Sequence, residues 1–125
     1  MKLARNRVFI VDDEPSILES LSQVLDDNGY LPVIANDIES IFSLGTPLHT
    51  IIIDIFMPGM GGIEGIKKIR ENYPDAMIIA MSGGWLDMDS EQALKAAKRA
   101  GADAILAKPF LADDLLNVLP DLMRQ

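Results

Sequence analysis

The sequence predicts an α/β protein built on a doubly wound, five-stranded parallel sheet with helices on both faces. Continuous apolar runs such as Val8–Val11 and Ile51–Ile53 lack the alternation of strands that face water on one side, and are typical of strands buried on both faces. Strand and helix patterns alternate five times with short connections, which favours right-handed crossovers between parallel strands. The 125 residues are enough for one domain of this kind.

The first helix is predicted by Pro15 and by the apolar residues that follow it. Proline is tolerated in the first turn of a helix, and Asp13 is placed to cap that turn. Apolar residues at helical spacing run from Ile17 to Leu25, and Asn28-Gly29 is a signal for the end of a helix.

The remaining elements follow from the same two kinds of pattern. Leu31–Ala35 is predicted as a short strand, and Asp37 can cap a short helix after it. The others, in chain order, are a helix that carries Ile38, Ile41 and Phe42, a strand at Ile51–Ile53, a helix with Ile63, Ile66 and Ile69 on one face, a strand at Met77–Met81, an alanine-rich helix over about Ser90–Ala100 closed by Gly101, a strand at Ala104–Ala107, and a last helix from about Ala112 that carries Leu115, Leu116, Leu119 and Leu122.

Composition and charge limit the classes of function. The formal net charge of −8 argues against binding to nucleic acid, because phosphates need a basic surface. No run is long and apolar enough to span a membrane, and the N-terminus lacks the apolar stretch of a signal peptide. The absence of cysteine suits a reducing compartment. We therefore expect a single cytoplasmic domain over residues 7–123.

Residues with chemistry follow four of the five predicted strands. They are Asp12 and Asp13 after the first strand, Asp54 after the third, Ser82 after the fourth and Lys108 after the fifth. The carboxyl ends of parallel strands meet at one edge of the sheet, where open α/β sheets bind ligands. With a strand order of 2-1-3-4-5, the first and third strands are neighbours, and their three carboxylates would crowd together.

Such a cluster is tolerable only with a cation, a protonated partner or Lys108 nearby, because two like charges ~4 Å apart repel by ~4 kcal/mol at an effective dielectric of ~20. Carboxylates and a backbone carbonyl are ligands that Mg²⁺ prefers, and Mg²⁺ commonly accompanies phosphate oxygens. An aspartate can itself become an aspartyl phosphate. Lys108, Ser82 and the amides of Gly83-Gly84 could then neutralise the oxygens of the transferred group. The pattern predicts a phosphoryl-acceptor site.

The same residues resemble a receiver domain of the two-component response regulators, which has a flavodoxin-like fold. The resemblance rests on the acid pair after the first strand, on Asp54 in Asp-Ile-Phe-Met-Pro-Gly, on Ser82 in Met-Ser-Gly and on Lys108 in Lys-Pro-Phe. It extends over roughly Arg7 to Met123. Each motif is weak alone, but four in this order are highly specific.

The resemblance implies a metal site and a phosphate acceptor. Asp54 would accept a phosphoryl group from a phosphohistidine of a histidine kinase or a histidine phosphotransfer protein. Asp13 and Asp54 would bind Mg²⁺ directly together with the backbone carbonyl of Phe56, and Asp12 would help through water.

The resemblance also implies how the phosphate is sensed. Ser82 would move to hydrogen-bond the phosphate, and Lys108 would pair with it, aimed by a cis bond to Pro109. The chain would be a signalling switch and no enzyme beyond its own phosphorylation and dephosphorylation. It would act on a downstream output protein or on an output domain missing from this chain, and homodimerisation on phosphorylation is possible.

Three residues depart from the family pattern. Ile105 stands where the family usually has a tyrosine or phenylalanine, so the usual aromatic readout of phosphorylation is in doubt. The ring of Phe56, two residues after the acceptor, could exclude attacking water and lengthen the life of the phosphoryl group. Pro120 interrupts the last helix by removing a hydrogen bond to the carbonyl of Leu116, so a dimer geometry cannot be assumed.

Three other classes of protein are alternatives to a phosphorylated receiver domain. A pseudo-receiver would keep the fold and bind partners without phosphate. A haloacid-dehalogenase-like phosphatase would need an Asp-x-Asp motif, but Phe56 occupies the place of the second acid. A flavin-binding flavodoxin-like protein would need a phosphate-binding loop after the first strand, which the sequence lacks.

Two further features have simple structural interpretations. Trp85, Leu86 and Met88 follow Gly83-Gly84 and either pack over the next helix or form a patch for a partner. His49 is the only histidine, and we expect it to be a loop residue rather than a metal ligand or phosphodonor.

Overall fold

The computed structural model describes residues 7–12, 14–43, 48–55, 62–82, 90–107 and 110–119. The chain forms a five-stranded parallel sheet in the order β2-β1-β3-β4-β5, as the sequence predicted. In chain order the elements are β1 (Arg7–Val11), α2 (Pro15–Asp27), β2 (Leu31–Ala35), α3 (Ile38–Ser43), β3 (Thr50–Asp54), α4 (Gly62–Asn72), β4 (Met77–Ser82), α5 (Ser90–Ala100), β5 (Ala104–Ala107) and α6 (Ala112–Val118).

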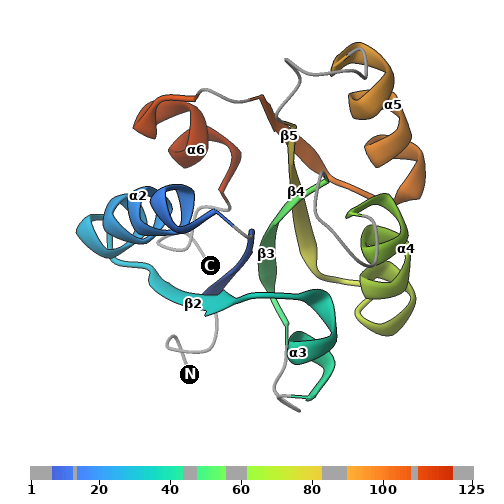
Figure 1. Cartoon of the computed structure of the whole chain (residues 1–125), viewed down its shortest axis with the longest axis horizontal. Helices are drawn as coiled ribbons and strands as arrows, with labels where there is room; N and C mark the ends of the chain where they lie inside the picture. The colour runs from blue at the N-terminus through green and yellow to red at the C-terminus, as the bar shows by residue number, and fades with distance from the viewer. Residues whose placement is uncertain are drawn as a thin grey trace.

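Helices cover both faces of the sheet. α2 and α6 lie on one face, while α3, α4 and α5 lie on the other (Figure 1). The central strand β3 is buried along its whole length. Ile51 and Ile53 pack with α3, α4 and α5, whereas Ile52 packs with α2 and α6. This two-sided burial explains the unbroken apolar run, because each such side chain contributes about 1.5–3 kcal/mol when removed from water.

Glycines end two of the helices, as predicted. Gly29 has a φ of 85° and Gly101 a φ of 126°, in the left-handed region that favours glycine. The chain reverses there through hydrogen bonds from the next residues back into the helix: the N–H of Tyr30 donates to the carbonyl of Leu25 at 2.9 Å, and that of Ala102 to the carbonyl of Ala97 at 3.0 Å.

The helix starts are partly as predicted. Asp37 does cap α3, because its Oδ1 accepts the N–H of Ser40 at 2.8 Å and the hydroxyl of Ser40 at 2.6 Å. The capping residue predicted for α2 was wrong. Glu14, and not Asp13, holds the N-cap position, and its side chain makes no capping hydrogen bond. Asp12 instead accepts the N–H of Glu14 at 3.0 Å, so the carboxylate that ends β1 also fixes the start of α2.

The last helix is shorter than predicted. α6 ends at Val118, and Leu119 adopts an extended conformation with φ −74° and ψ 148°. A residue that precedes a proline is forced out of the helical region, and Pro120 follows directly. The helix therefore stops before the proline, and Leu119 lies buried at its end. Leu122 lies outside the described residues.

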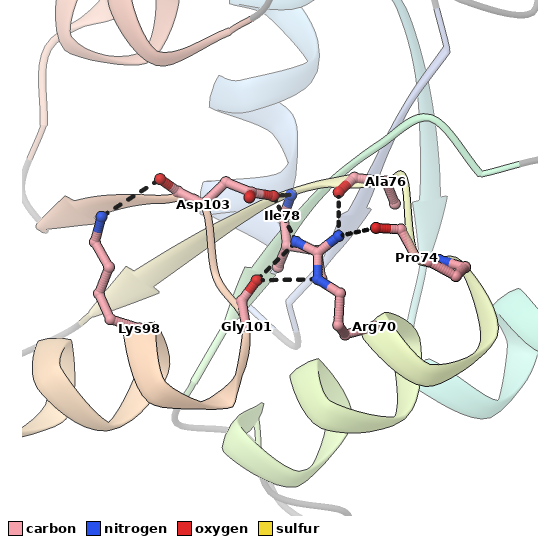
Figure 2. Close-up of polar contacts among 7 residues, drawn as sticks. All are labelled: Arg70, Pro74, Ala76, Ile78, Lys98, Gly101 and Asp103. Atoms are coloured by element: carbon pink, nitrogen blue, oxygen red, sulfur yellow. Dashed lines mark hydrogen bonds and ion pairs between the residues drawn. The ribbon is translucent and has the colours of Figure 1, made fainter.

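Arg70, near the end of α4, joins the connections that lead into the amino ends of β4 and β5 (Figure 2). Asp54 lies at the carboxyl end of its strand. Its guanidinium donates to the carbonyls of Pro74 at 2.7 Å, Ala76 at 2.8 Å and Gly101 at 2.7 Å, and forms an ion pair with Asp103 at 2.6 Å. The same Asp103 carboxylate accepts the N–H of Ile78 at 2.9 Å. One planar cation thus ties α4, β4 and the α5–β5 connection together.

Candidate functional site

Asp12 and Asp54 end neighbouring strands in the middle of the sheet. Val11 pairs with Ile53 in the parallel ladder between β1 and β3, so the next residue of each strand lies at the same level. Both carboxylates are buried, with 0% and 5% of their surface exposed. Because few aspartates are buried to this degree in globular proteins, the pair marks a site at the carboxyl edge of the sheet, as the sequence predicted.

The buried pair creates an electrostatic cost. If the two charges lie one strand spacing apart, about 4.8 Å, they repel by about 3.5 kcal/mol at an effective dielectric of about 20. A cation between the carboxylates would remove this cost. The donor set therefore fits a hard divalent cation such as Mg²⁺, which binds carboxylate oxygens.

The described residues hold only part of the predicted metal site. Asp12 and Asp54 are two of its carboxylates, while Asp13 and Phe56 lie outside the described residues. Within the part of the chain that the structure describes, no three His, Cys, Asp or Glu residues gather closely enough to hold a metal by themselves.

The backbone of Ser82 lies close to the carboxyl end of β3 in the ladder. Asp54 pairs with Met81, and the N–H of Ile55 donates to the carbonyl of Met81 at 3.0 Å, so β3 and β4 stay joined one residue beyond Asp54. Ser82 is the last residue of β4 and pairs with Ala107, the last residue of β5. The side chain of Ser82 is outside what the structure describes.

The remaining predicted site residue follows β5. Lys108 comes directly after Ala107, so its place in the sequence is at the same edge of the sheet, but Lys108 and Pro109 both lie outside the described residues. The predicted cis bond between them is likewise outside. Trp85, Leu86 and Met88, which were expected either to pack over the next helix or to form a patch for a partner, lie outside the described residues too.

Gly62 contributes to the site in a way that the sequence reasoning missed. It is the first residue of α4 and is buried, one residue before the apolar stripe that predicted this helix. A Cβ at Gly62 would lie 2.7 Å from the carbonyl oxygen of Asp54 and would overlap the Cα of Ile55. Only glycine lets α4 approach the end of β3 so closely. The position of Gly62 just before the apolar stripe of α4 was the available signal.

The structure also describes the positions of Ile105 and His49. Ile105 is partly buried on β5 and packs against the core on the α3, α4 and α5 face. His49 is exposed in the connection before β3, where its carbonyl accepts the N–H of Met77 at 2.7 Å, as expected for a loop residue. Among the helices that the structure describes, none has the length and apolarity needed to cross a membrane.

Comparison with protein families identifies the class of the chain. Residues 8–120 match the family model described as the response regulator receiver domain. Over 121 residues the chain is 31% identical to the response regulator MprA of Mycobacterium ulcerans. This alignment covers 95% of the chain and 50% of MprA, so the chain spans about half the length of this relative.

Solved structures share the fold. The chemotaxis response regulator CheY4 of Vibrio cholerae is 31% identical with a TM-score of 0.78, and the match covers 90% of this chain and 94% of CheY4. The BeF₃-activated receiver domain of DrrB is 26% identical with a TM-score of 0.79, and the match covers 95% of this chain and 97% of that domain.

Proposed function

The chain belongs to the response regulator receiver family, a family of signalling domains in two-component systems, and on this premise we propose that it is a switch controlled by phosphorylation of Asp54. The observation that carries the proposal is the pair of buried carboxylates, Asp12 and Asp54, at the adjoining ends of β1 and β3. Two buried acids at adjoining strand ends favour a bound cation, whose charge would offset theirs and that of a phosphoryl group on Asp54.

In this proposal Mg²⁺ is the cofactor. Asp13 and Asp54 bind it directly, the backbone carbonyl of Phe56 is a third ligand, and Asp12 acts through a water molecule. When bound, Mg²⁺ supplies positive charge that offsets the carboxylates and the phosphoryl oxygens. Asp12 also accepts the N–H of Glu14, and this hydrogen bond fixes the orientation of its carboxylate before any metal arrives.

The transfer step needs a nucleophile and groups that stabilise the phosphoryl oxygens. A carboxylate oxygen of Asp54 attacks the phosphorus of a phosphohistidine. The new O–P bond forms as the P–N bond breaks, and the donor imidazole keeps the electron pair and takes up a proton. Lys108 pairs with one phosphoryl oxygen, and the hydroxyl of Ser82 donates to another. The domain thus takes part in its own phosphorylation and later hydrolysis without acting on other substrates.

The partners follow from this chemistry. The donor is a histidine kinase or a histidine phosphotransfer protein in the cytoplasm. The receiver unit covers residues 7–123, and it passes the signal to an output protein or output domain by a changed surface, with homodimerisation as one form of that change. The BeF₃-activated receiver domain of DrrB supports this proposal by analogy, because beryllofluoride is a mimic of a phosphoryl group on a carboxylate.

Intact-mass spectrometry after treatment with acetyl phosphate tests the proposal. We expect wild type to gain the mass of one phosphoryl group only when Mg²⁺ is present, and Asp54→Asn to gain none. Asp75→Asn, which changes an exposed acid in the turn before β4, is the matched control and should behave as wild type. A gain that persists in Asp54→Asn would place the acceptor elsewhere. A folded wild type that gains no mass would favour a pseudo-receiver.

A further inference from the structure

A groove of about 530 Å³ lies between α2 and β2, and neither Asp12 nor Asp54 lines it. We call it the α2–β2 groove. β2 is an edge strand of the sheet (Figure 1). Its apolar lining is Pro15, Leu18, Pro32 and Ile34, and its polar lining is Glu19, Ser22, Gln23 and Asp26.

The groove exists because α2 covers β2 incompletely. The positions of α2 that line it, Glu19, Ser22 and Asp26, follow the three- and four-residue spacing of one helix face. An apolar face at these positions would cover the strand. Here the side chains are short or charged, and Ile34 is left 52% exposed. A large aliphatic side chain on a sheet edge is thus open to a partner.

The rim of the groove is acidic and without compensating charge. Glu19 and Asp26 are exposed, and neither has an ion-pair partner among the described residues. The sequence has no lysine or arginine between Arg7 and Lys67, while that stretch holds ten acidic residues. The groove therefore attracts positive charge and repels phosphate.

Ser22 adds an unused hydrogen-bonding group to the groove wall. Its Oγ is buried and has no hydrogen-bond partner among the described residues. A hydroxyl that is left unpaired when buried costs free energy, which a hydrogen bond to a bound group would recover. A peptide group lying in the groove could supply that bond after a rotation of the hydroxyl.

We propose that the α2–β2 groove binds an extended basic segment of a partner protein. An aliphatic side chain of the segment would pack on Pro32 and Ile34, and two basic side chains would pair with Glu19 and Asp26. These acids lie seven residues apart, about 10.5 Å along the helix. In a polyproline II segment, residues three apart lie on the same side and about 9.3 Å apart. The matching pattern is two basic residues separated by two others.

A second copy of this chain is a poorer occupant. Two such grooves facing each other would bring Glu19 and Asp26 of both copies together, and each copy has a net charge of −8. A basic segment of another protein meets no such repulsion, so it is the occupant to test.

NMR titration of the full chain with the peptide acetyl-Pro-Arg-Pro-Leu-Arg-Pro-amide tests the proposal. We expect amide shift changes confined to α2 and β2. Binding should weaken about fivefold to tenfold in Glu19→Gln/Asp26→Asn, since two exposed ion pairs are lost. Ile34→Ser should also weaken binding. Glu71→Gln/Asp75→Asn removes two exposed acids on the other side of the sheet and should bind as wild type.

A peptide with glutamate in place of both arginines should give no shifts at α2 and β2. The proposal is overturned if this acidic peptide binds equally well, or if the basic peptide gives no shifts in wild type. It is also overturned if Glu19→Gln/Asp26→Asn binds as tightly as wild type. Sedimentation that reveals self-association of wild type, lost in Ile34→Ser, would assign the groove to a second copy and overturn it as well. Ser22→Ala should remain folded and bind more weakly.

Discussion

The Asp12 side chain has two interactions, and they differ in how they depend on its negative charge. Its Oδ1 accepts the N–H of Glu14, a bond that a neutral asparagine could also make, but its negative charge lies beside that of Asp54. In the absence of a metal the charge is a cost, and with a metal it is an asset. The site thus trades stability of the free protein for affinity for a cation.

Asp12→Asn should therefore change stability and metal affinity in opposite directions. We expect the free energy of unfolding in EDTA to rise by about 1–2 kcal/mol, because one of two neighbouring charges is removed. Affinity for Mg²⁺ should fall about tenfold, since an outer-shell carboxylate is lost. Chemical denaturation in EDTA and a Mg²⁺ titration of intrinsic fluorescence measure the two effects. A variant less stable than wild type in EDTA would contradict this account of the buried pair.

Asp37, at the start of α3, makes a contribution to the stability of the fold that depends on pH. Hydrogen bonds from the side chain and then from the backbone N–H of Ser40 hold the pKa of the Asp37 carboxyl below its usual value of about 4. A lowered pKa in the folded state means that the charged cap stabilises the fold above pH ~4 and that this contribution is lost as the pH falls through the folded pKa.

Asp37→Asn isolates that contribution, because asparagine is also a good N-cap residue but carries no charge. We expect wild type to be the more stable protein at neutral pH, and the difference to shrink toward zero between about pH 4 and pH 2. Urea unfolding across that range measures it. A difference that is independent of pH would show that the charge of Asp37 has no role.

At the scale of elements, the position of α4 is set by a glycine. Gly62→Ala would push a methyl group against the backbone of Asp54 and Ile55, which cannot move without disturbing the ladder to β4. We expect a loss of about 1–3 kcal/mol of stability, typical of overpacking, and slower phosphorylation by acetyl phosphate. Thermal unfolding and the rate of mass gain measure the two effects.

Gly65→Ala is the matched control on the same helix. There the added methyl group would meet side-chain atoms of Ile38 and Ile53 and no backbone atom among its three nearest contacts, so the neighbours can adjust without moving a strand. The better helix propensity of alanine, about 1 kcal/mol, should offset the crowding. Equal effects of the two substitutions would contradict the claim that backbone contact with the acceptor strand is what requires Gly62.

Arg70 joins elements that the sequence does not mark as neighbours. Arg70→Lys keeps the charge but loses the planar fork that serves three carbonyls and Asp103 together (Figure 2). We expect the free energy of unfolding to fall by about 1–2 kcal/mol, a value reduced by the partial exposure of the ion pair. Lys68→Arg, on the exposed side of α4, should change stability by less than about 0.5 kcal/mol. If Arg70→Lys leaves the free energy of unfolding unchanged, the network does not stabilise the fold.

At the scale of the whole molecule, the topology could be predicted because local patterns and global constraints agree. Unbroken apolar runs require two covered faces, and alternation with helices leaves few possible strand orders. The order 2-1-3-4-5 and the convergence of Asp12 and Asp54 follow from it. These are properties of strands and registers, which the sequence encodes in its periodicity.

What could not be predicted depends on contacts across the fold. The reach of Arg70 to Gly101 joins residues distant in sequence, and no periodicity marks it or the packing of Gly62 against Ile55. The N-cap of α2 at Glu14 and the last residue of α6 at Val118 depend on local backbone geometry finer than the apolar pattern. The α2–β2 groove arises from what α2 fails to cover, so it appears only once the two elements are placed together.

The central claim, that the acid at the end of β3 is the phosphate acceptor, is tested most directly by locating the phosphoryl group. Borohydride reduces an aspartyl phosphate to homoserine, and peptide mass spectrometry then reads the position. After treatment with acetyl phosphate and Mg²⁺, we predict homoserine at position 54 alone, and none when EDTA replaces Mg²⁺. Homoserine at another acidic position, or at position 54 to the same extent without Mg²⁺, would contradict the account.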